Sequence, residues 1–107
     1  MNTFEKLFAV IRDRQQNPVE KSYTCYLFEQ GTDKICKKVG EEASETIIAA
    51  KNKNADELKN EICDLFFHAF VLAANEGVDI SDIEAELEAR SAKIGNLKDM
   101  KKTDKTT

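Results

Sequence analysis

Apolar side chains recur every three to four positions near the start of the chain, which is the period of one helix face. The residues concerned are Phe4, Leu7, Phe8, Val10 and Ile11. Asn2 precedes this run and Glu5 follows three residues later, the spacing of a capping box. The pattern predicts a first helix that ends before the Asn17-Pro18 pair, because the residue before a proline disfavours the helical conformation.

Similar start and stop signals predict four further helices. Ser22 is placed to cap a short second helix that ends at Gly31, and Thr32 to cap a long third helix from about Asp33 to about Lys53. Two more predicted capping boxes follow, one begun by an asparagine and one by a serine, together with glycines at positions typical of helix ends. They predict a fourth helix from Asn54 and Glu57 to about Glu76 with Gly77 after it, and a fifth from Ser81 and Glu84 to near Gly95.

These elements predict an all-α fold: a bundle of four to five helices, completed by dimerisation. Only 4 glycines and 1 proline occur in 107 residues, too few for the frequent turns of an all-β chain. Residues 1–95 form one predicted domain, and residues 96–107 form a polar, lysine-rich tail that we expect to be disordered. The fourth helix is apolar nearly all round, more than one small protomer covers, which favours a homodimer.

Charge and composition exclude several classes of function. A net charge of -4 argues against a nucleic-acid-binding protein with a broadly basic surface. The longest apolar run, residues 65–74, is too short for a membrane span, and the N-terminus has no signal-peptide layout. Three unpaired cysteines, at positions 25, 36 and 63, suit small hydrophobic residues in a reducing cytoplasm, so we expect a cytoplasmic protein without membrane or nucleic-acid partners.

Carboxylates are concentrated on two neighbouring predicted helices. Glu42 and Glu45 are three residues apart and share one helix face with the adjacent Glu41, while Glu61 and Asp64 repeat this spacing on the next helix. In an antiparallel hairpin, residues at equal height have a constant index sum. The pairs Glu42–Asp64 and Glu45–Glu61 both give 106, which centres the turn on residue 53 in a polar break. The sequence therefore predicts that these carboxylates meet at one level of the hairpin.

The position of these acids favours a metal site over a solvated charged face. Glu42 falls in the apolar seam of the third helix, and Glu61 lies between Leu58 and Leu65 on the fourth. Buried carboxylates repel one another and lose hydration unless a cation neutralises them, and Mg²⁺ takes such oxygen ligands. A di-iron site would need Glu-x-x-His, whereas Asp64 stands where the histidine would be. His68 is interpreted as a core or rim histidine, with a metal-ligand role as the alternative.

Two features beside the acids point towards phosphate chemistry. Gly40 lies inside the third helix, where a glycine indicates either close helix packing or the approach of a ligand. Basic residues flank the acids and suit phosphate oxygens. They are Lys34, Lys37, Lys38, Lys51 and Lys53 on or just after the acidic helix, and Arg90 and Lys93 late in the last helix.

The sequence resembles the phosphoribosyl-ATP pyrophosphatase family of histidine biosynthesis, within the all-α NTP pyrophosphatases. The resemblance covers about residues 4–95 and is carried by several short motifs. They are Ser22-Tyr23-Thr24, Leu27, Gly31, Lys34-Ile35, the run KKVGEEASE from Lys37 to Glu45, Glu61, Asp64-Leu65, His68, Val71-Leu72, Glu86-Leu87 and Arg90. The EExxE and ExxD spacings mark the wider superfamily.

The resemblance implies Mg²⁺-dependent hydrolysis of 1-(5-phosphoribosyl)-ATP to 1-(5-phosphoribosyl)-AMP and pyrophosphate, the second step of the pathway. It implies that Glu42, Glu45, Glu61 and Asp64 hold the metal, and that Glu41 binds a further metal or orients the attacking water. The same likeness places a small nucleotide against Lys34, Lys37, Lys38, Ser22, Tyr23, Thr24 and Arg90. Two alternatives stay open at this point: a related enzyme acting on dUTP, dCTP or other nucleotides, and a helical interaction module without activity.

Overall fold

A computed structural model of the chain describes residues 1–93 and 98–105, and these residues form helices without any strand. This confirms the predicted all-α class with five α-helices. Their bounds are α1 Thr3–Gln16, α2 Tyr23–Gln30, α3 Thr32–Lys51, α4 Ala55–Asn75 and α5 Ile80–Ser91, followed by a short 3-10 helix, η1, at Lys102–Lys105. No helix within the described ranges has the length and apolar character that crossing a membrane requires.

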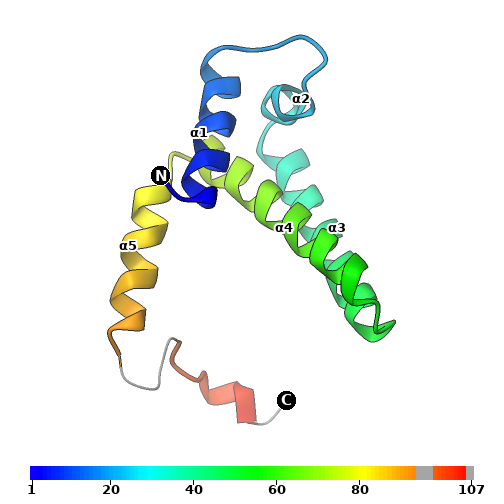
Figure 1. The fold of residues 1–107 in the computed structure, drawn as a ribbon, viewed down its shortest axis with the longest axis vertical. Helices are drawn as coiled ribbons and strands as arrows, with labels where there is room; N and C mark the ends of the chain where they lie inside the picture. Colours follow the sequence, from blue (N-terminus) through cyan, green and yellow to red (C-terminus); the bar gives the residue numbers. More distant parts are fainter. Residues whose placement is uncertain (94–97, 106–107) are drawn as a thin grey trace.

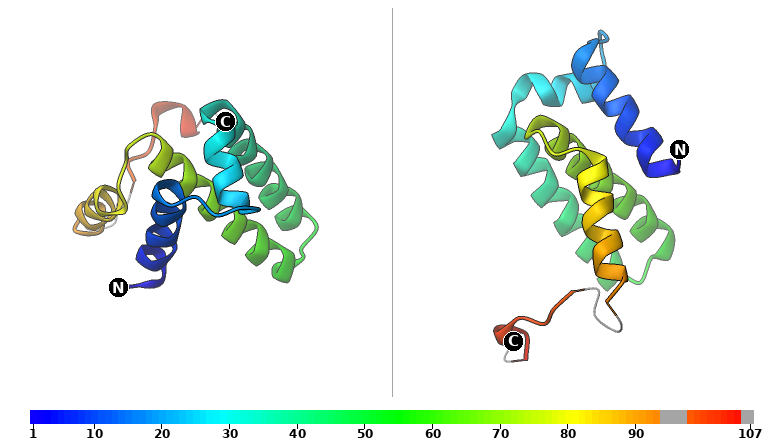
Figure 2. Two further views of the ribbon diagram at one scale, coloured as in Figure 1. Left: turned by 90° about the horizontal axis from the view of Figure 1, so that it is seen from above. Right: turned by 90° about the vertical axis from the view of Figure 1, so that its left-hand side faces the viewer.

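The two longest helices, α3 and α4, form an antiparallel hairpin along which the rest of the protomer is arranged (Figure 1). A turn from Asn52 to Asn54 joins them, with Lys53 at a φ of 55°. Helices α1 and α2 cover the end of the hairpin opposite this turn, and α5 packs chiefly on α1 and projects to one side (Figure 2). The hairpin predicted from the index sums is thus present, and its free end is held by α1 and α2.

The hydrophobic core lies between α1, α2 and the far end of the hairpin. Each of these helices contributes fully buried side chains: Phe8, Ile11, Leu27, Ile35 and Val71. Burying one such side chain contributes about 1.5–3 kcal/mol, so this cluster dominates the packing energy. Helix α5 contributes no fully buried residue. The turn end of the hairpin, by contrast, projects away from the core.

Helix caps follow the predicted signals at three of five starts. The Asn2 and Glu5 capping box is present, with the Glu5 amide donating to Asn2 Oδ1 at 2.8 Å. Ser22 and Asn54 likewise cap α2 and α4 by accepting from the amides of Cys25 and Glu57. Each cap satisfies backbone donors that the first helical turn leaves free, which typically contributes about 1 kcal/mol.

The other two starts correct the prediction. Gly31, at a φ of 89°, is the N-cap of α3 in place of Thr32, and Thr32 is already helical; the helix ends at Lys51, two residues early. Asp79, boxed with Asp82, caps α5 in place of Ser81. The backbone amide of Ser81 instead donates a hydrogen bond to the Asp79 side chain. The two possible capping residues are thus only two positions apart. Helix α5 ends at Ser91, and the predicted stop at Gly95 lies outside the described residues.

Three further expectations have mixed outcomes. All three cysteines are free, as predicted, yet Cys36 and Cys63 are exposed rather than part of the core. Gly40 is exposed, and a Cβ built there would meet nothing within 4 Å among the described residues, so none of their helices packs closely on it. Residues 96–97 and 106–107 of the expected tail lie outside the described residues, and the intervening part contains η1. Disorder of the tail therefore stays a prediction.

Candidate active site

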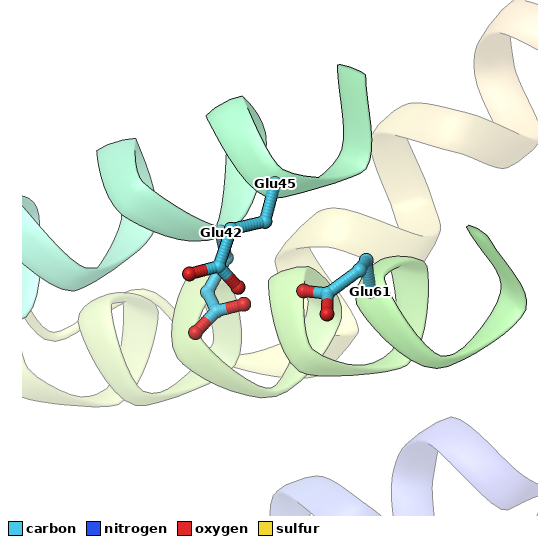
Figure 3. Close-up of side chains that lie close together, drawn as sticks. All are labelled: Glu42, Glu45 and Glu61. Atoms are coloured by element: carbon cyan, nitrogen blue, oxygen red, sulfur yellow. The ribbon is translucent and has the colours of Figure 1, made fainter. Parts of the chain in front are cut away.

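Three of the predicted carboxylates meet across the α3–α4 hairpin. Glu42 and Glu45 extend from α3 towards α4, and Glu61 extends from α4 to meet them (Figure 3). One carboxylate oxygen of each lies within 4.8 Å of the other two. The one-turn spacing of the α3 pair places both acids on one face, and the hairpin register places Glu61 opposite them. Three oxygens at this separation form an arrangement that can hold a metal ion.

Burial of Glu42, and partial burial of Glu61, make this group different from a solvated acidic face, although Glu45 is exposed. The Glu42 side chain is only 9% exposed, and Glu42 lies in a seam with the buried Ile35 and Ala49, as the periodicity predicts. Two buried carboxylate oxygens, Glu42 Oε2 and Glu61 Oε2, have no hydrogen-bond partner in the part of the chain that the structure describes. An unsatisfied buried carboxylate oxygen is unfavourable, and a bound cation removes that penalty.

The environment of the site raises the pKa of two of these acids, Glu61 and Glu42. Glu45, which a protonated Glu61 can hydrogen-bond, is the largest influence on Glu61, followed by burial and by Glu42, and together they raise its pKa to about 7. Burial raises the pKa of Glu42, and the charge of Glu45 acts in the same direction. Without a cation, the site therefore holds protons near neutral pH. A divalent cation would displace those protons.

Lys38 neutralises part of the acidic group from the same helix. Its Nζ atom lies 3.0 Å from Glu41 Oε2 and 3.9 Å from Glu42 Oε1. The hydrogen bond from Lys38 lowers the pKa of Glu41 and raises that of the lysine, so both stay charged. Glu41 therefore differs from the other acids: it is paired, partly exposed and ionised, and it lies outside the group of three.

Asp64, the fourth predicted metal ligand, does not join the group of three. Its side chain is exposed on α4, one turn after Glu61. Its backbone carbonyl instead accepts a hydrogen bond from Nδ1 of His68 at 2.7 Å. The other ring nitrogen, Nε2, is 2.9 Å from the Tyr23 hydroxyl, which begins α2. His68 is thus the buried histidine with satisfied hydrogen bonds that the sequence favoured, and it connects α2 to α4.

The remaining predicted substrate-binding residues fall into two groups. Lys34 and Lys37 lie on the same helix as the acids, with Lys34 Nζ 5.9 Å from the centre of the Tyr26 ring and Lys37 exposed. Ser22 is used as the N-cap of α2, and Thr24 follows it in the first turn. Arg90, by contrast, lies on α5, where it pairs with Glu86 at 3.0 Å. Because α5 packs chiefly on α1 and makes no comparable contact with α3 within the described residues, the protomer does not bring Arg90 to the acids.

Comparison with known proteins agrees with this geometry. A model of the phosphoribosyl-ATP pyrophosphohydrolase family matches residues 4–91, which span all five α-helices. The chain belongs to this family. The family resemblance noted in the sequence is therefore confirmed. The matched stretch contains every acid of the candidate site.

Individual relatives from this pyrophosphohydrolase family align over nearly their whole length. The phosphoribosyl-ATP pyrophosphatase of Clostridium botulinum strain Hall is 54% identical over 102 residues, covering 95% of this chain and 93% of that protein. The protein of the same name from Clostridium acetobutylicum is 55% identical over 93 residues, covering 87% and 84%. That of Bacillus thuringiensis strain Al Hakam is 46% identical over 103 residues, covering 96% of each.

Two contacts at the site of this pyrophosphohydrolase were not predicted from the sequence. One is the hydrogen bond between Tyr23 and His68, and the other is the pairing of Lys38 with Glu41. The second had a signal, because the two residues are three apart on one helix. The first had none, since Tyr23 and His68 are 45 residues apart and meet only through tertiary packing.

Proposed function

We propose that the chain hydrolyses 1-(5-phosphoribosyl)-ATP to 1-(5-phosphoribosyl)-AMP and pyrophosphate, the second step of histidine biosynthesis, in the cytoplasm. The observation that carries this proposal is the family match over residues 4–91. The proposal is supported within that match by the hairpin, which brings the carboxylates of Glu42, Glu45 and Glu61 within 4.8 Å of one another. The relatives named above carry the name of the same activity.

We propose Mg²⁺ as the metal of this site. The donor set fits a hard divalent cation, because it consists of carboxylate oxygens, two of them buried without a partner. Glu42, Glu45 and Glu61 would hold the ion, with Asp64 as the further predicted ligand from the same helix as Glu61. When bound, Mg²⁺ would supply charge neutralisation for phosphoryl oxygens and activation of water.

The residues around this centre have complementary tasks in the proposed reaction. Water attacks the α-phosphorus, the bond from that phosphorus to the bridging oxygen breaks, and pyrophosphate leaves. Glu41, ionised and paired with Lys38, is available to orient the water and accept its proton. Lys38, together with Lys34 and Lys37 on the same helix, provides positive charge for the triphosphate. Ser22, Tyr23 and Thr24 are assigned to the ribosyl-phosphate end.

We propose that the active form is a homodimer. The radius of gyration is 15.9 Å, whereas a compact chain of this length has about 13 Å. Between α1, α4 and α5 an apolar groove of about 250 Å³ is bordered by side chains that are 42–57% exposed: Phe4, Phe66 and Leu87. A second copy covering this groove would bury that surface. It would also pack against the exposed face of α5, the helix that carries the predicted substrate residue Arg90.

Sedimentation tests the assembly. The chain should sediment as a dimer at micromolar concentration, and Leu87→Asp should shift it towards monomer. Val19→Asp, which places the same charge on an exposed loop residue, should leave the dimer intact. A wild-type monomer would refute the assembly without affecting the assignment of the reaction.

The activity is tested with the purified full chain, phosphoribosyl-ATP and Mg²⁺, measuring both products. We expect pyrophosphate and phosphoribosyl-AMP in equal amounts, and none without a divalent cation. Glu45→Ala and Asp64→Ala should each lose most turnover, while Asp56→Ala, an exposed acid on the same helix as Asp64, should retain it. Faster hydrolysis of dUTP or dCTP would assign the chain another substrate of the superfamily. Near wild-type turnover in both site variants would refute the metal-ligand assignment.

A further inference from the structure

His68 occupies a special place beside the acidic centre. It is the single histidine of the chain, it is 5% exposed, and both of its ring nitrogens are used. Nδ1 bonds the Asp64 carbonyl at 2.7 Å, and Nε2 bonds the Tyr23 hydroxyl at 2.9 Å. Nothing in the proposed reaction uses this imidazole directly. A buried polar side chain with both nitrogens bonded fixes the relative position of the groups that it joins.

The chemistry of the two bonds determines where each hydrogen lies. A backbone carbonyl only accepts, so Nδ1 of His68 must carry a hydrogen and donate it to Asp64. In the neutral imidazole Nε2 then has only a lone pair, so it accepts the hydrogen of the Tyr23 hydroxyl. The phenol oxygen of Tyr23 consequently has no hydrogen left to offer. Towards the outside it can act only as an acceptor.

The ring of Tyr23 is held firmly while one side stays accessible. It stacks on Tyr26 and on Phe67, each with ring centres 6.1 Å apart, and meets the edge of His68 at 5.7 Å. Even so, Tyr23 is 46% exposed. Its hydroxyl bonds His68, whose other ring nitrogen bonds the Asp64 carbonyl one turn after Glu61, which places the phenol beside the acidic site.

We propose that His68 is a positioning residue that makes Tyr23 an acceptor-only contact for the substrate. By retaining the phenol hydrogen, the imidazole directs the Tyr23 oxygen towards donors. Among substrate groups, a ribose hydroxyl is such a donor, whereas a phosphate oxygen is not. This assignment of the ribose to Tyr23 rests on the proposed function. The hydrogen-bond polarity does not, because it follows from the protein alone.

The polarity is tested by ¹⁵N NMR on the metal-free protein with the imidazole in its neutral form. Because the chain has one histidine, both ring signals are assigned without ambiguity. We expect a protonated Nδ1 and an unprotonated, hydrogen-bonded Nε2. Tyr23→Phe should shift the Nε2 signal towards that of a free nitrogen, and Tyr26→Phe, the other tyrosine of α2, should leave it unchanged. Protonation at Nε2, or no response to Tyr23→Phe, would overturn the proposal.

Kinetics with phosphoribosyl-ATP test the consequence for the substrate. Tyr23→Phe should raise KM about 2- to 10-fold, the loss of one hydrogen bond, with kcat nearly unchanged. His68→Asn keeps a donor for the Asp64 carbonyl but removes the acceptor for Tyr23, so it should raise KM similarly. His68→Gln places an acceptor near the Nε2 position, so it should return KM towards the wild-type value. The Tyr23→Phe, His68→Asn double variant should be no worse than either single variant.

The outcomes separate this proposal from the proposed function. Multiplying effects in the double variant, or losses in kcat alone, would overturn the positioning role even in an active enzyme. An inactive wild-type protein would refute the proposed reaction, while the NMR result would still decide the hydrogen-bond polarity. Thermal unfolding of each variant confirms that the comparison is made between folded proteins.

Discussion

Adding Mg²⁺ to the metal-free protein should release protons in an amount that depends steeply on pH. The neighbouring Glu45, burial and Glu42 raise the pKa of Glu61 to about 7, so the empty site is partly protonated at neutral pH. A carboxylate must be deprotonated to bind a metal ion, so binding and proton release are linked. The same crowding of acids that forms the ligand set therefore determines the pH response.

The size of the effect follows from the pKa of Glu61. A group with a pKa of 7 holds about 0.9 proton at pH 6, about 0.5 at pH 7 and about 0.1 at pH 8. Binding should release those fractions, and the apparent affinity for Mg²⁺ should fall about tenfold between pH 8 and pH 6. Burial also raises the pKa of Glu42, which adds to the release in the same direction. The figures for Glu61 are therefore lower limits.

Isothermal titration calorimetry in two buffers of different ionisation enthalpy measures the released protons directly. Glu61→Gln should abolish most of the release and weaken binding, because the variant has neither the proton nor the charge. Asp56→Asn changes an exposed acid of the same helix, so its proton count should match the wild type. A wild-type count near zero at pH 6, with an affinity that does not change up to pH 8, would falsify this account of the site.

Three further predictions concern stability. The folded pKa of Glu61 lies above its ordinary value of 4.5, so its contribution to the metal-free protein is full below pH 4.5 and is lost as pH rises through about 7. The melting temperature of the wild type should therefore fall relative to that of Glu61→Gln as pH rises from 4.5 through about 7. Leu27→Ala, at a fully buried site, should lower the free energy of unfolding in urea by about 2–5 kcal/mol. An exposed change such as Val10→Ala should alter it by no more than about 0.5 kcal/mol. Asn54→Ala should cost about 1 kcal/mol by uncapping α4, measured by the same unfolding, without altering proton release.

Much of the fold could be predicted because its signals are local. The Asn2 and Glu5 box, the Ser22 cap and the seam containing Glu42 depend on residues a few positions apart, and all three are present. Errors arose where two local signals overlapped. Asp79 and Ser81 each begin a box pattern, and the backbone decides between them, because the Val78 amide bonds the Ala73 carbonyl and sets where the chain enters α5.

The candidate site was predictable only as far as the hairpin register reaches. Equal index sums correctly placed Glu45 opposite Glu61, since a short polar turn leaves two antiparallel helices little freedom to slide. The sums do not determine side-chain rotation, and so they also placed Asp64 with the cluster, whereas its carboxylate lies outside the group of three. Nor do they locate α2, whose Tyr23 reaches His68 through the packing of a separate helix.

The energetics of Glu42 favour a metal centre over a charged helix face. On a solvated face an acid is exposed and keeps its hydration. Glu42 instead lies in the apolar seam, with Oε2 buried and without a partner among residues 1–93 and 98–105, and Lys38 approaches only its other oxygen, at 3.9 Å. Burial of such a group opposes folding and drives it to hold a proton. The like charge of Glu45, whose carboxylate lies within 4.8 Å of that of Glu42, increases that tendency. An arrangement that is unfavourable in three ways without a cation becomes favourable with one, which is why the ligand set, rather than the net charge, is the feature that indicates function.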